Sequence, residues 1–293
     1  MNPIILFRNS GTPEADAEQA CAAEHLPLTT DRTDCPTGSL VIGRYSVEPF
    51  YAELSQELLK NSSDLINTTS QHNWANNFDY YAILGEDTPK SWTEPEFLAS
   101  SHPGPFVVKG QTYSRKHEWN RKMFAPDRQR ALALGDELKQ DNLLRSQKII
   151  FREYIPLRQF KRTENGLPIS NEWRIFYLGK TRLCRGYYWS EHTPPDEGLP
   201  SEAIELADRA AARIGAAINF FVLDIAQKAS GGWIIIELND AQMCGLAGNS
   251  ALELYENLAR NLPDWVNNSM ENLRPESAPA ASSATLRNSQ SDL

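Results

Sequence analysis

The 293-residue sequence has no long apolar run and no paired cysteines. A helix that crosses a membrane needs about 18 or more consecutive apolar residues, and no stretch approaches that length. The first residues lack the layout of a secretory signal peptide. The four cysteines are scattered without a Cys-x-x-Cys pair, which argues against a zinc site and against a disulfide scaffold. These absences predict a soluble, cytoplasmic protein with reduced thiols and no membrane partner.

Negative charge predominates but is unevenly distributed. The net charge is −9, yet residues 105–185 contain 18 Lys and Arg against 8 Asp and Glu. A basic middle segment in an acidic protein predicts an anionic ligand bound there. A solvated surface with scattered charges is the alternative interpretation.

Strand and helix patterns alternate at the start of the chain. The apolar runs at 4–7 and 38–46 have the composition of strands, and helical patterns follow them at 12–25 and 47–60. This alternation favours an α/β unit with parallel strands. Pro-rich punctuation between residues 88 and 105 then indicates a lobe boundary.

Beyond this boundary the sequence predicts a mixture of strands and helices. Strands are expected at 105–109, 148–155, 172–178, 181–189, 218–226 and 233–239, and helices at 127–141, 201–215 and 250–262. The Gly-Lys pair between 172–178 and 181–189 is typical of a tight hairpin. From Pro275 onward the chain is rich in Ser, Ala, Pro and Asn, which predicts a disordered tail.

Polar side chains end an otherwise apolar strand, Trp233 to Asn239. Because strand side chains alternate between faces, Glu237 and Asn239 are expected on one side of the sheet and Leu238 on the other. Asp224 lies in the preceding apolar strand, and a Ser-Gly-Gly turn predicts antiparallel pairing that brings it close to both. Such oxygen donors suit Mg²⁺. Polar strand ends that face water are the alternative.

Lys109 comes directly after Phe-Val-Val, at the end of a predicted interior strand. A buried lysine is unfavourable unless a negative charge pairs with it, and a nucleotide phosphate would serve. The loop that follows supplies backbone N–H groups, the Ser114 hydroxyl and the Arg115 guanidinium. A lysine that ends a strand at a water interface is the alternative.

The segment 151–160 is a strand that stops at Pro156. An exposed backbone edge there can hydrogen-bond an adenine, while Ile155 and Leu157 supply apolar faces for the ring. An ordinary edge strand that leaves a sheet explains the segment equally well.

The order of these segments resembles the ATP-grasp superfamily. Val-Val-Lys, Arg-Glu-Tyr-Ile-Pro, Glu-Trp-Arg, Leu-Asp-Ile and Ile-Glu-Leu-Asn follow one another within residues 85–262. Glu-Trp-Arg-Ile-Phe and Glu-Leu-Asn-Asp-Ala-Gln further resemble the clade named for two conserved arginines and a lysine. The resemblance implies two α+β lobes that clamp ATP, preceded by a small Rossmann-like α/β domain. The expected bounds are 1–84 for that domain, 85–265 for the ATP-grasp domain, with lobes at 85–155 and 156–265, and 266–293 for a disordered tail.

The resemblance also implies a set of site residues. ATP is expected to contact Lys109, Ser114, Arg115, Lys148, Glu153, Tyr154, Ile155, Arg158 and Gln159. Mg²⁺ is expected at Asp224, Glu237 and Asn239, and Arg174 or Arg185 is expected to face the γ-phosphate. Many relatives bind the ribose with a glutamate a few residues after the hinge, where this sequence has only Arg158 and Gln159 as candidates.

The function that the resemblance implies is ATP- and Mg²⁺-dependent ligation, in which a carboxylate becomes an acylphosphate and an amine captures it. The basic segment predicts an anionic peptide or amino acid as the carboxylate substrate. A nucleic-acid ligase is an alternative, because Tyr113, Trp119 and Trp189 can stack bases, although Lys109 lacks the Lys-x-Asp-Gly context of a lysine–adenylate. A non-catalytic ATP-binding adaptor is the second alternative, disfavoured by the intact charged residues.

Overall fold

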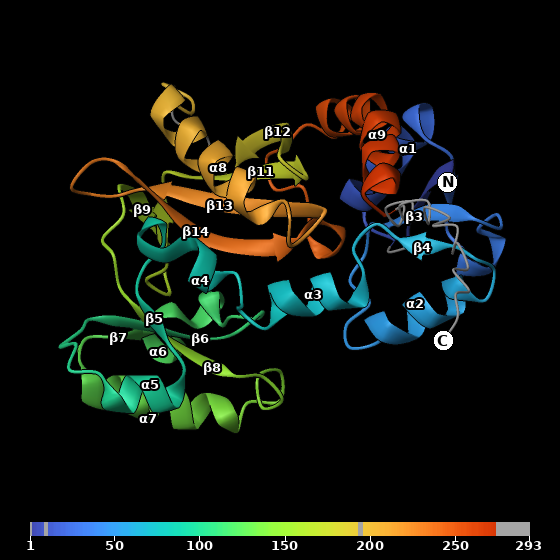
Figure 1. Ribbon diagram of the computed structural model, residues 1–293. Helices are drawn as coiled ribbons and strands as arrows, with labels where there is room; N and C mark the ends of the chain where they lie inside the picture. The colour runs from blue at the N-terminus through green and yellow to red at the C-terminus, as the bar shows by residue number, and fades with distance from the viewer. Residues whose placement is uncertain (1, 9–10, 193–195, 274–293) are drawn as a thin grey trace, which may run out of the picture.

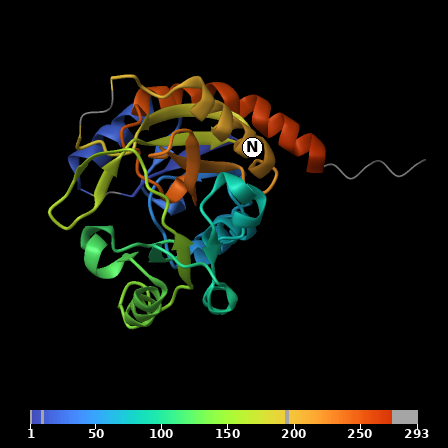
Figure 2. The same ribbon diagram turned by 90° about the vertical axis from the view of Figure 1, so that its left-hand side faces the viewer.

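The computed structural model describes residues 2–8, 11–192 and 196–273 of the chain. Figure 1 shows an N-terminal α/β body beside two lobes that face each other, and each of the three contains a four-stranded sheet. The first lobe and helix α9 (Ala251–Leu273) lie at opposite ends of the molecule in both Figure 1 and Figure 2.

The N-terminal sheet is parallel, as the alternating pattern predicts. Its order is β2-β1-β3-β4, with β1 at Asn2–Leu6, β2 at Leu28–Thr29, β3 at Ser39–Gly43 and β4 at Asp64–Leu65. Ile5 of β1 packs on the side of α1 (Pro13–His25) and α9, whereas Ile4 and Leu6 pack on the side of α2 (Tyr51–Leu59). Burial on both faces explains why this strand is apolar without alternation.

The first lobe contains an antiparallel sheet in the order β5-β8-β6-β7. Its strands are β5 (Ser91–Trp92), β6 (Phe106–Gly110), β7 (Phe124–Ala125) and β8 (Ile149–Glu153), and its helices are α5 (Glu94–Ala99), α6 (Trp119–Lys122) and α7 (Arg128–Lys139). Phe97 of α5 stacks on Phe151 of β8. Gly135 of α7 is required beside this ring, because a Cβ there would lie 2.7 Å from Phe151. One face of the sheet is therefore core, and the other is left for the site.

The second lobe contains an antiparallel sheet in the order β12-β11-β13-β14. Its strands are β11 (Glu172–Leu178), β12 (Thr181–Tyr187), β13 (Phe220–Gln227) and β14 (Trp233–Asp240), and a separate ribbon is formed by β9 (Gln159–Arg162) and β10 (Pro168–Ser170). Helix α8 (Ser201–Ile214) covers one face. On the opposite face, Phe176 and Val222 pack toward α9, and the rest of that face lies over the first lobe.

The remaining elements connect these bodies. They are α3 (Thr69–Asn76), α4 (Tyr81–Leu84) and the 3₁₀ helices η1 (Arg32–Asp34), η2 (Gly85–Asp87), η3 (Lys116–Glu118) and η4 (Ala241–Met243). Helix α3 has a recognisable start in the sequence, because Thr68 and Gln71 form a reciprocal capping box there. The division of the chain at residue 84 stays a prediction.

The first residues of the tail expected at 266–293 belong to a helix instead. Helix α9 continues through Pro263 to Leu273, because Trp265 and Val266 pack against the core beneath the helix. The rest of the expected tail, 274–293, lies outside the described residues. No helix in the described ranges is long and apolar enough to cross a membrane. All four cysteines are free, and the cytoplasmic location inferred from their spacing stays a prediction.

Candidate active site

A cavity of about 160 Å³ lies between the two lobes. Strands β6 and β8 contribute to it from the first lobe, and β11 and β14 from the second. Its apolar lining includes Met123, Ile155, Leu157 and Ile236, and its charged lining includes Lys109, Lys116, Arg152, Glu153, Glu172 and Glu237. Charged groups from both lobes therefore meet over an apolar surface.

Strand register brings three charged residues of the second lobe into one row. Asp224 of β13 lies directly opposite Arg174 of β11 on one side and Glu237 of β14 on the other. Residues directly opposite each other in antiparallel strands have their side chains on the same face. The antiparallel pairing predicted from the Ser-Gly-Gly turn is confirmed, and it places both carboxylates side by side.

A β-bulge in β14 changes the strict alternation that the sequence suggests. The partners of Asp224 and Ile225 are Glu237 and Ile235, so that Ile236 is left without a partner in the ladder. Ile236 and Glu237, although consecutive, both line the cavity. The backbone carbonyl of Ile236 accepts a hydrogen bond from Arg152 of β8. The bulge thus turns Glu237 toward the cavity and fixes β14 to the first lobe.

Lys109 and Glu237 form an ion pair across the cavity. Lys109 is 8% exposed, and the charged partner that its burial requires is this carboxylate. Burial alone would raise the pKa of Glu237, but the Lys109 ammonium outweighs it and holds that pKa below its ordinary value. The two lobes therefore meet through a buried pair of opposite charges.

Arg174 and Asp224 form a second buried pair beside the first. The guanidinium donates from Nε to Oδ1 and from Nη2 to Oδ2, each at 2.8 Å. Its Nη1 donates to the carbonyl oxygen of Gly245 at 2.9 Å. Burial acts to lower the pKa of Arg174, but the Asp224 carboxylate outweighs it and raises that pKa, so the arginine stays charged.

The oxygen donors at the end of β14 fit a hard divalent cation. Asn239 is half-buried and acts to lower the pKa of Glu237. The two residues lie opposite Val222 and Asp224, so they share a face as alternation predicts. Asp224 lies opposite Glu237 but is held by Arg174. Among the described residues no group of three His, Cys, Asp or Glu side chains forms a metal cluster. The donor set is therefore two carboxylates and one amide oxygen, which is the chemistry that Mg²⁺ prefers.

Comparison with known families identifies the architecture around this cavity. The matching family model describes an ATP-grasp domain, family 3 of the clade named for two arginines and a lysine, and it covers residues 98–262, more than half of the chain. The chain belongs to this ATP-grasp family. The family and the clade expected from the order of the motifs are confirmed.

Solved structures of ATP-grasp ligases share the fold. The ligase PsnB complexed with a minimal precursor is 12% identical at a TM-score of 0.56, over 89% of this chain and 99% of that chain. D-cycloserine synthetase DcsG is 13% identical at a TM-score of 0.57, over 89% and 99%. D-alanine–D-alanine ligase from Bacillus anthracis, complexed with ATP, is 13% identical at a TM-score of 0.55, over 93% and 100%. No curated protein matches the sequence. The fold of two α+β lobes preceded by an α/β body is confirmed.

The nucleotide residues expected from the ATP-grasp resemblance divide into two groups. Lys109, Ser114, Glu153, Tyr154 and Ile155 line the cavity. Arg115, Lys148, Arg158 and Gln159 are not among its lining residues. Arg115 pairs with Asp141, Lys148 is exposed at the start of β8, and Arg158 is exposed and bonds Gln227 at 3.1 Å.

Arg174 and Arg185 lie on opposite faces of their sheet. Arg185 is exposed and lies opposite Ile175, which packs in the core beneath α8. Arg174 is buried on the face that carries Asp224. The structure therefore brings Arg174 to the carboxylates and separates Arg185 from them.

Glu172 is a cavity residue that the sequence patterns did not indicate. It is buried at the start of β11 and lines the cavity. A ribose-binding carboxylate was expected only among the residues directly after the hinge, where Arg158 and Gln159 lie. The β9–β10 ribbon lies in the chain between the hinge and β11, at whose start Glu172 is found. The sequence feature that could have indicated Glu172 is a lone glutamate at the start of an apolar strand, two residues before Arg174.

Two cations contact one phenol ring at the second-lobe side of the cavity. Lys116, from the loop after β6, donates from Nζ to the Tyr188 hydroxyl at 2.8 Å and lies 5.0 Å from the ring centre. Arg174 lies over the same ring, also 5.0 Å from its centre. The loop that follows Lys109 is thus anchored to the second lobe, next to the buried arginine.

Glu172 predicts a pH dependence of stability. Burial and then the charge of Asp224 raise the pKa of Glu172 to about 8. Since the folded state holds this proton and the unfolded state has released it above about pH 4.5, the free energy of unfolding falls as the pH rises toward 8. The slope is on the order of 1.4 kcal/mol per pH unit in this window. Urea unfolding of the nucleotide-free protein and of Glu172→Gln between pH 5 and 8 measures it, and parallel pH profiles of the two proteins would contradict it.

Proposed function

We propose that the protein is an ATP- and Mg²⁺-dependent carboxylate–amine ligase that releases ADP and phosphate. One observation carries the proposal: Lys109 of the first lobe pairs with Glu237 of the second lobe across the cavity, and Glu237 lies opposite Asp224, which pairs with Arg174. Membership of the ATP-grasp family and ligases as structural neighbours support it.

The hinge side of the cavity suits the adenosine part of ATP. Ile155, Leu157 and Ile236 supply apolar surface for the adenine. Among the carboxylates that line the cavity, Glu172 is buried and follows the β9–β10 ribbon directly in the chain. We assign the ribose hydroxyls to it. This assignment replaces Arg158 and Gln159 as candidates for the ribose contact.

Lys109 and the β14 oxygens suit the phosphates. ATP phosphate oxygens compete with Glu237 for the Lys109 ammonium, so nucleotide binding frees this carboxylate. Asp224, Glu237 and Asn239 would then hold Mg²⁺, which supplies positive charge to the phosphates when bound. Arg174 is the guanidinium closest to the carboxylates, where its planar fork suits phosphoryl oxygens.

The reaction proceeds by two displacements. A carboxylate oxygen of the first substrate attacks the γ-phosphorus, and the bond to the β,γ-bridging oxygen breaks, giving ADP and an acylphosphate. The amine nitrogen then attacks the acyl carbon, phosphate leaves with the C–O bonding electrons, and the nitrogen loses a proton. The protein contributes positioning and charge neutralisation, for which Lys109 and Arg174 are the cationic groups. An anionic carboxylate substrate stays our expectation from the basic middle segment.

The product distinguishes this function from the alternatives. With ATP, Mg²⁺ and a panel of carboxylates and amines, we expect ADP and phosphate in a 1:1 ratio with the amide formed. AMP would favour nucleotidyl transfer to a nucleic acid, and Mg²⁺-dependent ATP binding without turnover across the panel would favour an adaptor.

Glu237→Gln tests the proposed metal site and the ion pair between Glu237 and Lys109. The variant keeps the size of the side chain but removes its charge, so we expect the rate of ADP release to fall by about 100-fold or more. The variant also needs a higher Mg²⁺ concentration for half-maximal rate. Glu205→Gln removes an exposed carboxylate on α8 and serves as the matched control. A wild-type rate and Mg²⁺ dependence in Glu237→Gln would refute the assignment.

Arg174→Lys tests the role of the guanidinium while keeping the charge that Asp224 requires. We expect kcat to fall by about tenfold or more, because an ammonium cannot make the paired hydrogen bonds of arginine. The KM for ATP stays within about threefold of the wild-type value, because an interaction that acts on the phosphoryl group during transfer contributes to kcat and not to ground-state binding. Steady-state kinetics of ADP release measure both, and an unchanged kcat would remove Arg174 from the reaction.

Glu172→Ala tests the ribose assignment. We expect the KM for ATP to rise by about tenfold, the contribution of a hydrogen bond to a charged or strongly polar group. The wild type is expected to prefer ATP over 2′-deoxy-ATP, and the variant to lose this preference. Gln159→Ala, in the ribbon, is the control and keeps it. If Gln159→Ala loses the preference for ATP over 2′-deoxy-ATP and Glu172→Ala keeps it, the ribose contact belongs to Gln159 and not to Glu172.

A further inference from the structure

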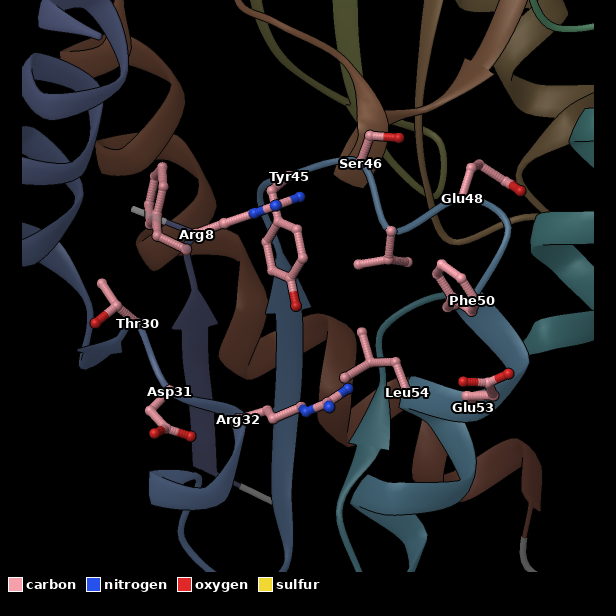
Figure 3. A pocket seen from close by; sticks show the side chains of 12 residues that line it. Arg8, Thr30, Asp31, Arg32, Tyr45, Ser46, Glu48, Phe50, Glu53 and Leu54 are labelled. Carbon is pink, nitrogen blue, oxygen red and sulfur yellow. The ribbon is translucent and has the colours of Figure 1, made fainter. Parts of the chain in front are cut away.

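Two larger cavities lie at the carboxyl end of the N-terminal sheet, apart from the cavity between the lobes. One, of about 610 Å³, is shown in Figure 3, and the second is about 530 Å³. They share Phe7, Arg8, Tyr45 and Ser46, which directly follow β1 and β3. We call the two together the N-terminal crevice.

The position of this crevice is one at which α/β sheets bind ligands. The chain passes from β1 to β2 on one side of the sheet and then to β3 on the other side of β1. The loops after β1 and β3 therefore diverge to opposite sides and leave a gap between them. Open parallel sheets bind ligands outside the carboxyl ends of their strands at such a switch point.

Cationic and hydroxyl donors converge on one part of the crevice. Figure 3 shows Arg8 beside Tyr45, with Arg32 reaching into the cavity below the phenol. Arg8 is exposed and makes no ion pair with any residue that the structure describes. Arg32 pairs with Glu57 at 2.9 Å but keeps half of its side chain exposed. Burial raises the pKa of Tyr45, and the charges of both arginines act against this rise, which places both near the phenol.

Three acids, Asp31, Glu48 and Glu53, line the same cavity. Asp31 accepts from the backbone N–H of Thr33 at 2.8 Å and from its hydroxyl at 2.7 Å. Glu48 pairs with His72 and points away from the cavity in Figure 3. Glu53 remains as the carboxylate at the rim. Arg8, which makes no ion pair among the described residues, lies beside Tyr45, and this local arrangement favours an anionic group at that position.

The opposite wall is apolar and partly exposed. Val47 and Leu54 line it, and Phe50 is 57% exposed beside them. A ligand that fits this wall carries an apolar portion next to its anionic group.

The second cavity leads toward the proposed reaction site. Its far wall consists of Gln242, Met243, Cys244 and Gly245, which follow β14. The Gly245 carbonyl accepts from Arg174 at 2.9 Å. A ligand that extends from Arg8 to Gly245 therefore ends beside the arginine that we assign to the acylphosphate.

We propose that the N-terminal crevice binds the amine acceptor, an α-amino acid or short peptide whose carboxylate is held by Arg8, Arg32 and the Tyr45 hydroxyl and whose amine extends toward Gly245. This inference rests on the proposed ligase function, and it identifies the chemical class of the second substrate. A free carboxylate on the acceptor is the feature that the crevice recognises.

The first experiment measures binding without catalysis. Isothermal titration of the full-length protein, without ATP, uses the twenty L-amino acids and a set of dipeptides, each as the free acid and as the C-terminal amide. We expect free acids with apolar side chains to bind, and their amides to bind at least about tenfold more weakly because a charged hydrogen-bond partner is lost. Equal affinity of acid and amide, or no binding by any member at millimolar concentration, would overturn the proposal.

The second experiment assigns the contacts. Arg8→Gln and Tyr45→Phe are expected to weaken binding of the best free acid by about tenfold and threefold, since a charged and a neutral hydrogen bond differ in strength. Arg209→Gln, an exposed arginine on α8, is the matched control and keeps wild-type affinity. Unfolding curves verify that each variant is folded. Wild-type affinity in both crevice variants would also overturn the proposal.

Kinetics separate this proposal from the function on which it rests. In Arg8→Gln we expect the KM for the acceptor to rise by about tenfold, with the KM for ATP and the kcat at saturation unchanged. If an acceptor supports amide formation and Arg8→Gln leaves its KM unchanged, the ligase function stands and the crevice proposal fails. If free acids bind in an Arg8-dependent way but no amide forms, the crevice stands as a carboxylate site and the ligase function fails.

Discussion

Two neighbouring ion pairs, one across the lobe interface and one within the second lobe, are the constraint on which the rest of the site depends. Lys109 is neutralised by Glu237, and Arg174 by Asp224, on adjacent strands. Removing one member of such a pair leaves a charge in a poorly solvated site, which is strongly destabilising. The Lys109–Glu237 pair therefore joins the two lobes at the cavity.

Two local irregularities place functional groups where regular structure would not. The bulge at Ile236 turns two consecutive residues toward the cavity and offers a carbonyl to Arg152. The β9–β10 ribbon separates the hinge from Glu172 along the chain, while β11 returns that glutamate to the cavity. Irregularities of this kind leave most of the sheet pairing intact and change which side chains point into the cavity.

The N-terminal body is fastened to the end of β14, so the crevice and the reaction site are held in fixed relation. Asp240 accepts from Asn67 at 2.8 Å and lies 2.9 Å from His72. Burial acts to lower the pKa of His72, but Asp240 and Glu48 outweigh it and raise that pKa to about 9, so the histidine is charged at neutral pH. Arg44, at the end of β3, pairs with Glu18 and donates to the Ala241 carbonyl. The N-terminal crevice is thereby held against the strand that carries Glu237 and Asn239.

The sequence by itself determined the family, the order of strands and helices, and the residues whose chemistry depends on local pattern. Glu237 and Asn239 share a face because strand side chains alternate, and Lys109 requires a partner because it ends a buried strand. Tertiary structure alone decided which partner each charge has, which arginine faces the carboxylates, and that Glu172 lines the cavity. These depend on register, on a bulge and on the length of an inserted ribbon. Such features join residues far apart in the chain, so no local pattern specifies them.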